Sequence, residues 1–329
     1  MYNYEDIKDV HLEITSKCQA RCPMCPRRLQ GGQMMPWVKL NEISLEQFKT
    51  WFPVDFVKQL SKLNMCGNLG DPIIAKDTVL IYRYIKENNP NIQLQMHTNG
   101  SARDLQFWKD LAELNVIIVF GIDGLEDTHS RYRIGTDFNK IIKNATAFIN
   151  SGGYARWDML VFDHNKHQVE KCEKLAYELG FKLFQKKNSS RFKDGQYNVL
   201  DDTGKTVDIL YPTEQSKNFI DKIKESKKEV TPTITCKATR DQQIYVAADG
   251  TVSPCCWLDM SWMPHGNYER IDYMDKINSF PNLNSQSLKE IFKSRYFNKI
   301  ESTWNTNSCL LTCKKQCGRF DKLGEQFEG

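Results

Sequence analysis

The chain has 329 residues, with 45 Lys and Arg against 41 Asp and Glu, so its formal net charge is +4. Forty percent of the residues are apolar and 26% are charged, as in ordinary globular proteins. So small a charge excess does not indicate nucleic-acid binding, and we expect no nucleic-acid partner. The chain has no run of 18 apolar residues and begins without a secretory signal, so we expect a cytoplasmic protein with no membrane partner.

Strand-like and helix-like segments alternate through the first two thirds of the chain. The predicted strands are 10–15, 61–67, 92–98, 116–122, 156–162 and 181–186, and the predicted helices are 44–60, 77–88, 103–114, 138–151 and 166–179. Six strand–helix repeats predict an α/β fold with a parallel sheet and helical crossovers. Six repeats are too few for an eight-fold barrel, so we predict a partial, open (βα)6 TIM-like barrel with its chemistry at the carboxyl ends of the strands.

The remaining third of the chain has a different character. Residues 187–235 are polar and carry two turn signals, which predicts a linker with an exposed helix at 214–229. After it we predict a hairpin across Asp249–Gly250 and an amphipathic helix at 287–300. The predicted organisation is a barrel at 1–186, a bridging region at 187–235 and a small α+β domain at 236–329.

Cysteines are the most informative residues in the sequence. There are 11, an odd number. Cytosolic proteins rarely keep stable disulfides, so clustered cysteines in such a chain indicate metal or cluster ligands. Cys66 and Cys172 lie in predicted elements and are expected to be buried.

The first cysteine group follows the first predicted strand. Cys18, Cys22 and Cys25 have the spacing C-x3-C-x2-C. Three thiolates this close on a loop can bind three irons of a [4Fe–4S] cube and leave the fourth iron open to a substrate group. A zinc site is the alternative, but it needs a fourth nearby ligand, and neither His11 nor His97 has the spacing of a zinc pair.

The run CQARCPMCP after a first strand resembles the cluster motif of the radical S-adenosylmethionine (SAM) superfamily. Over about residues 10–186 the resemblance implies a partial (βα)6 barrel and a [4Fe–4S] cluster whose open iron chelates SAM. Reductive cleavage of SAM would give a 5′-deoxyadenosyl radical that abstracts a hydrogen from the substrate. A reductant such as flavodoxin or ferredoxin is implied, while the protein positions the reactive carbon and excludes water.

Further motifs lie where that superfamily places its SAM pocket. GNLGDP (67–72) resembles the GGEP motif, with Asp71 in place of Glu, and its turn would present backbone carbonyls to the SAM amino group. Relatives have polar side chains near the ribose at the end of the third strand, where this chain has Thr98–Asn99–Gly100. The candidate SAM-binding residues here are Gly67, Asn68, Gly70, Asp71, Pro72, Thr98 and Asn99.

The fourth and fifth strands end in the remaining SAM-pocket candidates. Residues 121–124, GIDG, resemble the SIDG motif and contain Asp123, but Gly121 replaces the usual serine, so a hydroxyl contact is absent. HSRYR (129–133) resembles the HDKYR stretch of anaerobic sulfatase-maturating enzymes, and by that match Arg133 would pair with the SAM carboxylate. Asn165, after the fifth strand, is a further candidate.

The C-terminal cysteines form a second pattern. Cys236, Gly250 and Cys255 have the spacing C-x13-G-x4-C, which resembles the opening of SPASM and twitch extensions that bind auxiliary iron–sulfur clusters. A full SPASM domain has seven cysteines and two auxiliary clusters, whereas this region has six and lacks the C-x2-C-x5-C-x3-C run. The resemblance therefore implies one auxiliary [4Fe–4S] cluster held by Cys236, Cys255 and members of the group Cys309, Cys313 and Cys317. The sequence leaves open which of the three bind.

Cys256 is the residue that bears most on mechanism. In sulfatase-maturating relatives an acidic residue follows the cluster cysteine and acts as a base, but here that position is a thiol. The thiol would serve as a hydrogen-atom donor to a substrate radical, as in peptide epimerases of the superfamily, or as a spare cluster ligand. The third alternative is a small buried side chain.

These features lead to three functional hypotheses. The first is a radical SAM enzyme that modifies a peptide or protein. The second is a twitch-type dehydrogenase that oxidises a small polar molecule, and the third is a non-catalytic iron–sulfur or zinc protein, which would have no use for the SAM-pocket motifs. The basic and aromatic segment 26–43 is either a lid over the substrate or a surface loop.

Overall fold

The computed structural model describes residues 1–189, 191–192, 195–226, 233–261 and 280–319. Its main sheet has eight strands in the order β11-β10-β1-β2-β3-β4-β5-β6. Every neighbouring pair from β10 to β6 is parallel, and only β10 with β11 is antiparallel. The strands are β1 (Asp9–Leu12), β2 (Lys62–Met65), β3 (Gln93–Thr98), β4 (Val116–Gly121), β5 (Ala155–Val161), β6 (Leu183–Asn188), β10 (Gln243–Val246) and β11 (Val252–Ser253).

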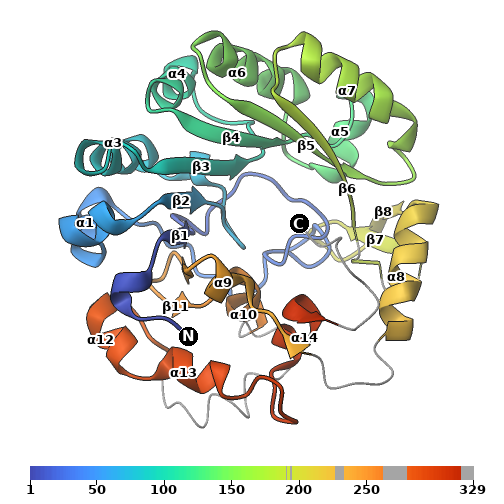
Figure 1. The fold of residues 1–329 in the computed structure, drawn as a ribbon. Coiled ribbons are helices and arrows are strands. Elements are labelled where there is room, and N and C mark those ends of the chain that lie inside the picture. The colour runs from blue at the N-terminus through green and yellow to red at the C-terminus, as the bar shows by residue number, and fades with distance from the viewer. Residues whose placement is uncertain (190, 193–194, 227–232, 262–279, 320–329) are drawn as a thin grey trace.

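Six consecutive strands, β1 to β6, curve into an open barrel with helices along the outer side (Figure 1). This confirms the predicted partial (βα)6 barrel. Along the first strand, Val10, Leu12 and Ile14 are buried in the main apolar core. His11 and Glu13 alternate with them, and the His11 ring contacts the Cys66 carbonyl at 2.7 Å. The alternation therefore places polar side chains on the inner face of the sheet.

The barrel helices follow the predicted order with two differences. They are α1 (Leu45–Trp51), α2 (Val54–Gln59), α3 (Thr78–Asn88), α4 (Leu105–Glu113), α5 (Glu126–Tyr132), α6 (Phe138–Asn150) and α7 (Val169–Glu178). The single helix predicted at 44–60 is wrong, because Pro53 lacks an N–H and begins a new helix there. The sequence analysis also missed α5, which carries most of the HSRYR motif.

The C-terminal part joins the barrel sheet. The predicted hairpin across Asp249–Gly250 is confirmed as β10–β11, with Gly250 at φ +86°. β10 pairs in parallel with β1, and Asp9 lies opposite Gln243. Helices α12 (Leu288–Lys293) and α13 (Tyr296–Glu301) share the barrel's apolar core. They replace the single helix predicted at 287–300, since the chain turns at Arg295 with φ +61°. The domain boundaries at 186 and 236 stay a prediction.

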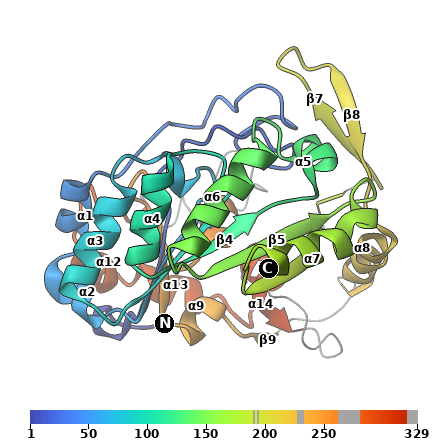
Figure 2. The same cartoon turned by 90° about the horizontal axis from the view of Figure 1, so that it is seen from above.

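The region predicted as a linker contains a second hairpin. β7 (Tyr197–Leu200) and β8 (Thr206–Leu210) pair antiparallel and project from the end of the barrel (Figure 2). The predicted exposed helix follows as α8 (Glu214–Ser226). The 26–43 segment packs on this hairpin, where the Leu200 amide donates to the Gln30 carbonyl at 2.9 Å.

The remaining elements surround the C-terminal cysteines. They are β9 (Thr233–Ile234), α9 (Lys237–Arg240), α10 (Cys256–Ser261), α14 (Leu311–Cys317) and β12 (Gly318–Arg319), and β12 pairs with β9. Figure 1 shows α9, α10 and α14 below β1, at the open side of the barrel. In the described ranges, no helix has the length and apolar character needed to cross a membrane.

Candidate active site and auxiliary cluster site

The three N-terminal thiols lie in the loop that follows β1. Cys22 is buried, and Cys18 and Cys25 are half-buried. They pack with a second apolar cluster, which includes Ala20, Met24, Tyr132, Phe162 and Phe192. Burial raises the pKa of the Cys22 thiol to about 11, and the nearby Arg133 guanidinium opposes this rise. Three thiols in an apolar setting suit a cubane cluster, since water is excluded from the metal centre.

The GNLGDP turn lies directly against this loop. A Cβ atom on Gly70 would lie 1.6 Å from the Thr15 carbonyl oxygen, so only glycine fits there. The Asp71 carboxylate accepts hydrogen bonds from the Thr98 hydroxyl and the Asn99 backbone N–H, both at 2.8 Å. The predicted SAM-pocket residues from β2 and β3 therefore do meet, and Asp71 fastens the end of β3 to the turn.

Asn99 also reaches the first cysteine. Its Nδ2 donates to Asp71 at 2.6 Å and to the Cys18 sulfur at 3.6 Å. Its Oδ1 accepts from Gln19 at 2.7 Å. Asn99 thus connects the cluster loop to the end of β3, beside the predicted SAM pocket.

The sequence analysis missed Glu13, which is 1% exposed on the inner face of the sheet. Its Oε1 accepts from the backbone N–H groups of Leu69 and Gly70, at 2.6 and 3.0 Å. Its Oε2 accepts from the Tyr245 hydroxyl of β10 at 2.9 Å. Burial raises the pKa of Glu13 to about 7 despite these donors. The signal of this role in the sequence was an acidic residue at one of the polar positions that alternate with Val10, Leu12 and Ile14.

A buried ion pair marks the end of β4. Arg133 Nε donates to Asp123 Oδ2 at 2.6 Å, and Asp123 is fully buried. A Cβ atom on Gly121 would lie 2.6 Å from Arg133 Nη2. A serine at position 121 would therefore have to displace the guanidinium, which occupies that space.

Asn165 has a structural role. It is fully buried, and its Nδ2 donates to the Asp123 and Leu160 carbonyls at 3.1 and 2.9 Å. Its Oδ1 accepts from the Phe162 amide at 2.7 Å. Both sides of the amide are used within the protein, so no exposed surface remains for the cofactor contact expected from the sequence.

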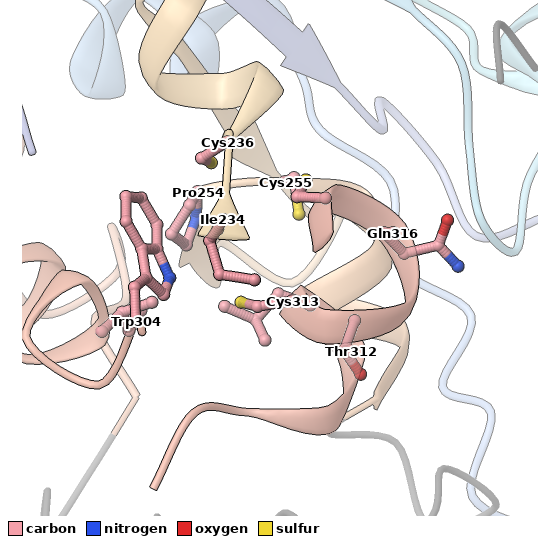
Figure 3. A pocket seen from close by; sticks show the side chains of 11 residues that line it. Ile234, Cys236, Pro254, Cys255, Trp304, Thr312, Cys313 and Gln316 are labelled. Atoms are coloured by element: carbon pink, nitrogen blue, oxygen red, sulfur yellow. The ribbon is translucent and has the colours of Figure 1, made fainter. Parts of the chain in front are cut away.

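Four C-terminal thiols converge on one pocket. Cys236, Cys255, Cys313 and Cys317 line it together with apolar side chains that include Ile234, Pro254 and Leu258 (Figure 3). Cys317 donates a hydrogen bond to Cys236, which lowers the pKa of Cys236 to about 6. Cys309 is buried outside the pocket lining, and its thiol lies 3.7 Å from the Leu310 carbonyl. Cys309 thus differs from the other two members of its group in not lining the pocket, although its thiol is near enough to raise the pKa of Cys313.

Four thiols lining one pocket match the number of ligands that a cubane cluster takes. Within the described part of the chain, no three His, Cys, Asp or Glu side chains are arranged to hold a single metal ion. Zinc draws four ligands onto one ion, whereas each thiolate of a cubane cluster binds a different iron. The pocket also contains the Trp304 indole, whose buried N–H group faces the Cys313 thiol and has no oxygen or nitrogen acceptor among the described residues.

Cys256 lies where α10 meets the GNLGDP turn. It begins α10 directly after Cys255, and its carbonyl accepts from Asn68 Nδ2 of the GNLGDP turn at 3.1 Å. Burial raises the pKa of the Cys256 thiol to about 12, and the charges of Cys66 and Asp259 add to the effect. Cys66 itself is only half-buried after β2, whereas Cys172 is fully buried, as expected.

A family model described as the radical SAM superfamily matches residues 12–176, which is half of the chain. The chain belongs to the radical SAM superfamily. A second model, the SPASM iron–sulfur cluster-binding domain, matches residues 236–318. Membership in this superfamily implies a [4Fe–4S] cluster and SAM as cofactors, and the SPASM match implies auxiliary iron–sulfur clusters.

Two curated relatives of this radical SAM enzyme have assigned roles. The antilisterial bacteriocin subtilosin biosynthesis protein AlbA of Bacillus subtilis is 22% identical over 281 residues, covering 79% of this chain and 58% of AlbA. The FeMo cofactor biosynthesis protein NifB of Methanocaldococcus jannaschii is 26% identical over 117 residues, covering 34% of this chain and 38% of NifB. The match therefore spans less than two thirds of either relative.

Solved structures share the fold of this radical SAM enzyme. SuiB of Streptococcus suis bound to S-adenosylmethionine matches with a TM-score of 0.57 and 12% identity, over 87% of this chain and 65% of SuiB. AnSMEcpe with bound AdoMet matches with a TM-score of 0.58 and 17% identity, over 95% of this chain and 86% of that chain. At these identities the likeness shows the fold.

Proposed function

We propose that this radical SAM enzyme modifies a peptide or protein by abstracting a hydrogen atom from it. The observation that carries the proposal is the meeting of the Cys18–Cys25 loop with Asp71 after β2, Asn99 after β3 and Arg133 at the end of α5. The names of the relatives favour a peptide substrate. AlbA serves bacteriocin biosynthesis, SuiB has been solved with the precursor peptide SuiA, and anSMEcpe with the Cp18Cys peptide.

Cys18, Cys22 and Cys25 would hold the SAM-binding cluster, which supplies the 5′-deoxyadenosyl radical once SAM is bound and a reductant such as flavodoxin or ferredoxin delivers an electron. The chain's own residues position SAM. The backbone of Gly67 to Pro72 would receive the amino group, and Arg133 would pair with the carboxylate. Asp123 orients the Arg133 guanidinium through the 2.6 Å contact at Nε, which leaves the Nη edge for a carboxylate.

The auxiliary [4Fe–4S] cluster would bind Cys236, Cys255, Cys313 and Cys317. These four thiols line one pocket, and they supply the four ligands that a cubane cluster takes. Cys309 is not among the ligands in this proposal, because its side chain lies outside the pocket lining.

Cys256 would donate a hydrogen atom to the substrate radical, and the thiyl radical left on its sulfur would return to the thiol by taking up a proton and an electron from the reductant. The support is its place beside Cys255, with its backbone tied to Asn68 of the SAM turn. A hydrogen donor must be near the carbon from which hydrogen was abstracted, and this junction is where the two halves of the site meet. A substrate that loses and regains hydrogen at one carbon would be epimerised.

Iron and sulfide analysis after anaerobic reconstitution tests the cluster assignments. The wild type should hold about eight irons per chain, and a Cys18/Cys22/Cys25→Ala variant about four. The variant should also fail to form 5′-deoxyadenosine from SAM under dithionite. About four irons in the wild type and none in the variant would contradict the auxiliary cluster.

The substrate class needs a separate experiment. Reduced enzyme, SAM and peptides encoded near the gene would be incubated in D2O and analysed by mass spectrometry. Deuterium in the product, lost in Cys256→Ala while 5′-deoxyadenosine still forms, would support hydrogen donation by the thiol. An oxidised product without solvent deuterium would instead support a dehydrogenase.

A further inference from the structure

One polar group in the auxiliary pocket faces sulfur. Trp304 follows α13, and its buried indole N–H has no oxygen or nitrogen acceptor among the described residues but acts as a hydrogen-bond donor toward the Cys313 thiol. The same side chain lines the pocket of Cys236, Cys255, Cys313 and Cys317. Figure 3 shows the ring nitrogen turned toward the interior of the pocket, on the side of Cys313.

A buried N–H group without an acceptor is rare, because it loses its water and gains nothing in return. The indole is held in place, since the Trp304 amide donates to the Glu301 carbonyl at 3.0 Å and its ring packs on the main core. The nearby walls of the pocket, Ile234 and Pro254, have apolar side chains, and the polar groups of Thr312 and Gln316 point away from the centre in Figure 3. Sulfur is therefore the acceptor that this arrangement offers to the N–H group.

We propose that Trp304 is a positioning residue for the auxiliary cluster and donates a hydrogen bond from Nε1 to one of its sulfurs, on the Cys313 side. The inference rests on the auxiliary cluster of the proposed function. Hydrogen bonds to the sulfurs of an iron–sulfur cluster stabilise its more negative, reduced form and raise its reduction potential. Trp304 would thus make the auxiliary cluster a better electron acceptor.

The test is an EPR-monitored redox titration of the Cys18/Cys22/Cys25→Ala protein, in which only the auxiliary cluster contributes to the EPR signal. Trp304→Phe keeps an aromatic ring but removes the N–H group. In Trp304→Phe we expect the one-electron reduction of the auxiliary cluster to become about tenfold less favourable, which is equivalent to a midpoint potential ~59 mV lower. Trp108→Phe is the matched control, since its Nε1 donates to the Ala102 carbonyl within the barrel helices, and the potential should not change.

A second measurement does not depend on the variant's stability. Protein labelled with ¹⁵N-tryptophan should show a ¹⁵N coupling to the reduced auxiliary cluster by pulsed EPR, together with an exchangeable proton. An unchanged potential in Trp304→Phe, or no ¹⁵N coupling in the labelled protein, would overturn the role of Trp304. An absence of iron in the triple-cysteine variant would instead overturn the auxiliary cluster, and iron analysis reveals this before any potential is measured.

Discussion

Glu13 should make the free energy of unfolding depend on pH near neutrality. Burial raises its pKa from an ordinary value of 4.5 to about 7. The folded protein therefore binds more protons than the unfolded chain between these two values. The stabilisation is fully present below pH 4.5 and is lost as the pH rises through 7. At ~1.36 kcal/mol for each pH unit, the loss amounts to about 3 kcal/mol.

Glu13→Gln removes the titration with little change of shape. Its amide oxygen can still accept from the Leu69 and Gly70 N–H groups. Urea unfolding of the apoprotein, followed by circular dichroism from pH 5 to 8, gives the free energy of unfolding for both proteins. Between pH 5 and 8 the wild type should lose about 2.5 kcal/mol relative to Glu13→Gln.

The control for this experiment is Glu87→Gln, which removes a carboxylate from an exposed position on α3. Its unfolding free energy should follow the wild type at every pH. If the curves of Glu13→Gln and wild type run parallel instead, Glu13 titrates alike in the folded and unfolded chains. The argument from burial would then be refuted.

Three further predictions concern the two cluster sites. By iron analysis, the Cys309→Ser variant should keep about eight irons per chain, whereas the Cys313→Ser variant should keep only about four. Equal losses of iron in the two variants would contradict the assignment of Cys236, Cys255, Cys313 and Cys317 as the cluster ligands. Arg133→Lys should weaken SAM binding about tenfold, measured by anaerobic equilibrium dialysis, because lysine cannot pair with Asp123 and with a carboxylate at once. An unchanged affinity would exclude the pairing of Arg133 with the SAM carboxylate. Cys256→Ala should still form 5′-deoxyadenosine from SAM under dithionite, and loss of that product would mean that Cys256 is needed for SAM cleavage.

Local patterns in the sequence were enough to identify much of this protein. The alternation of strands and helices predicted the partial barrel, and the spacing of Cys18, Cys22 and Cys25 predicted the first cluster. The Asp249–Gly250 turn predicted the hairpin that brings Cys255 toward Cys236. Each of these signals lies within a short stretch of chain, where backbone preferences and side-chain spacing act directly.

Only the tertiary structure decided which distant residues meet. Glu13 contacts Tyr245 across 232 positions of the chain, and the four C-terminal thiols meet without Cys309. The parallel pairing of β10 with β1 makes the first of these contacts, and the packing of α10 and α14 contributes to the second. Such contacts depend on how whole elements pack around a shared core. Spacing along the chain therefore identified the candidate ligands, and three-dimensional packing selected among them.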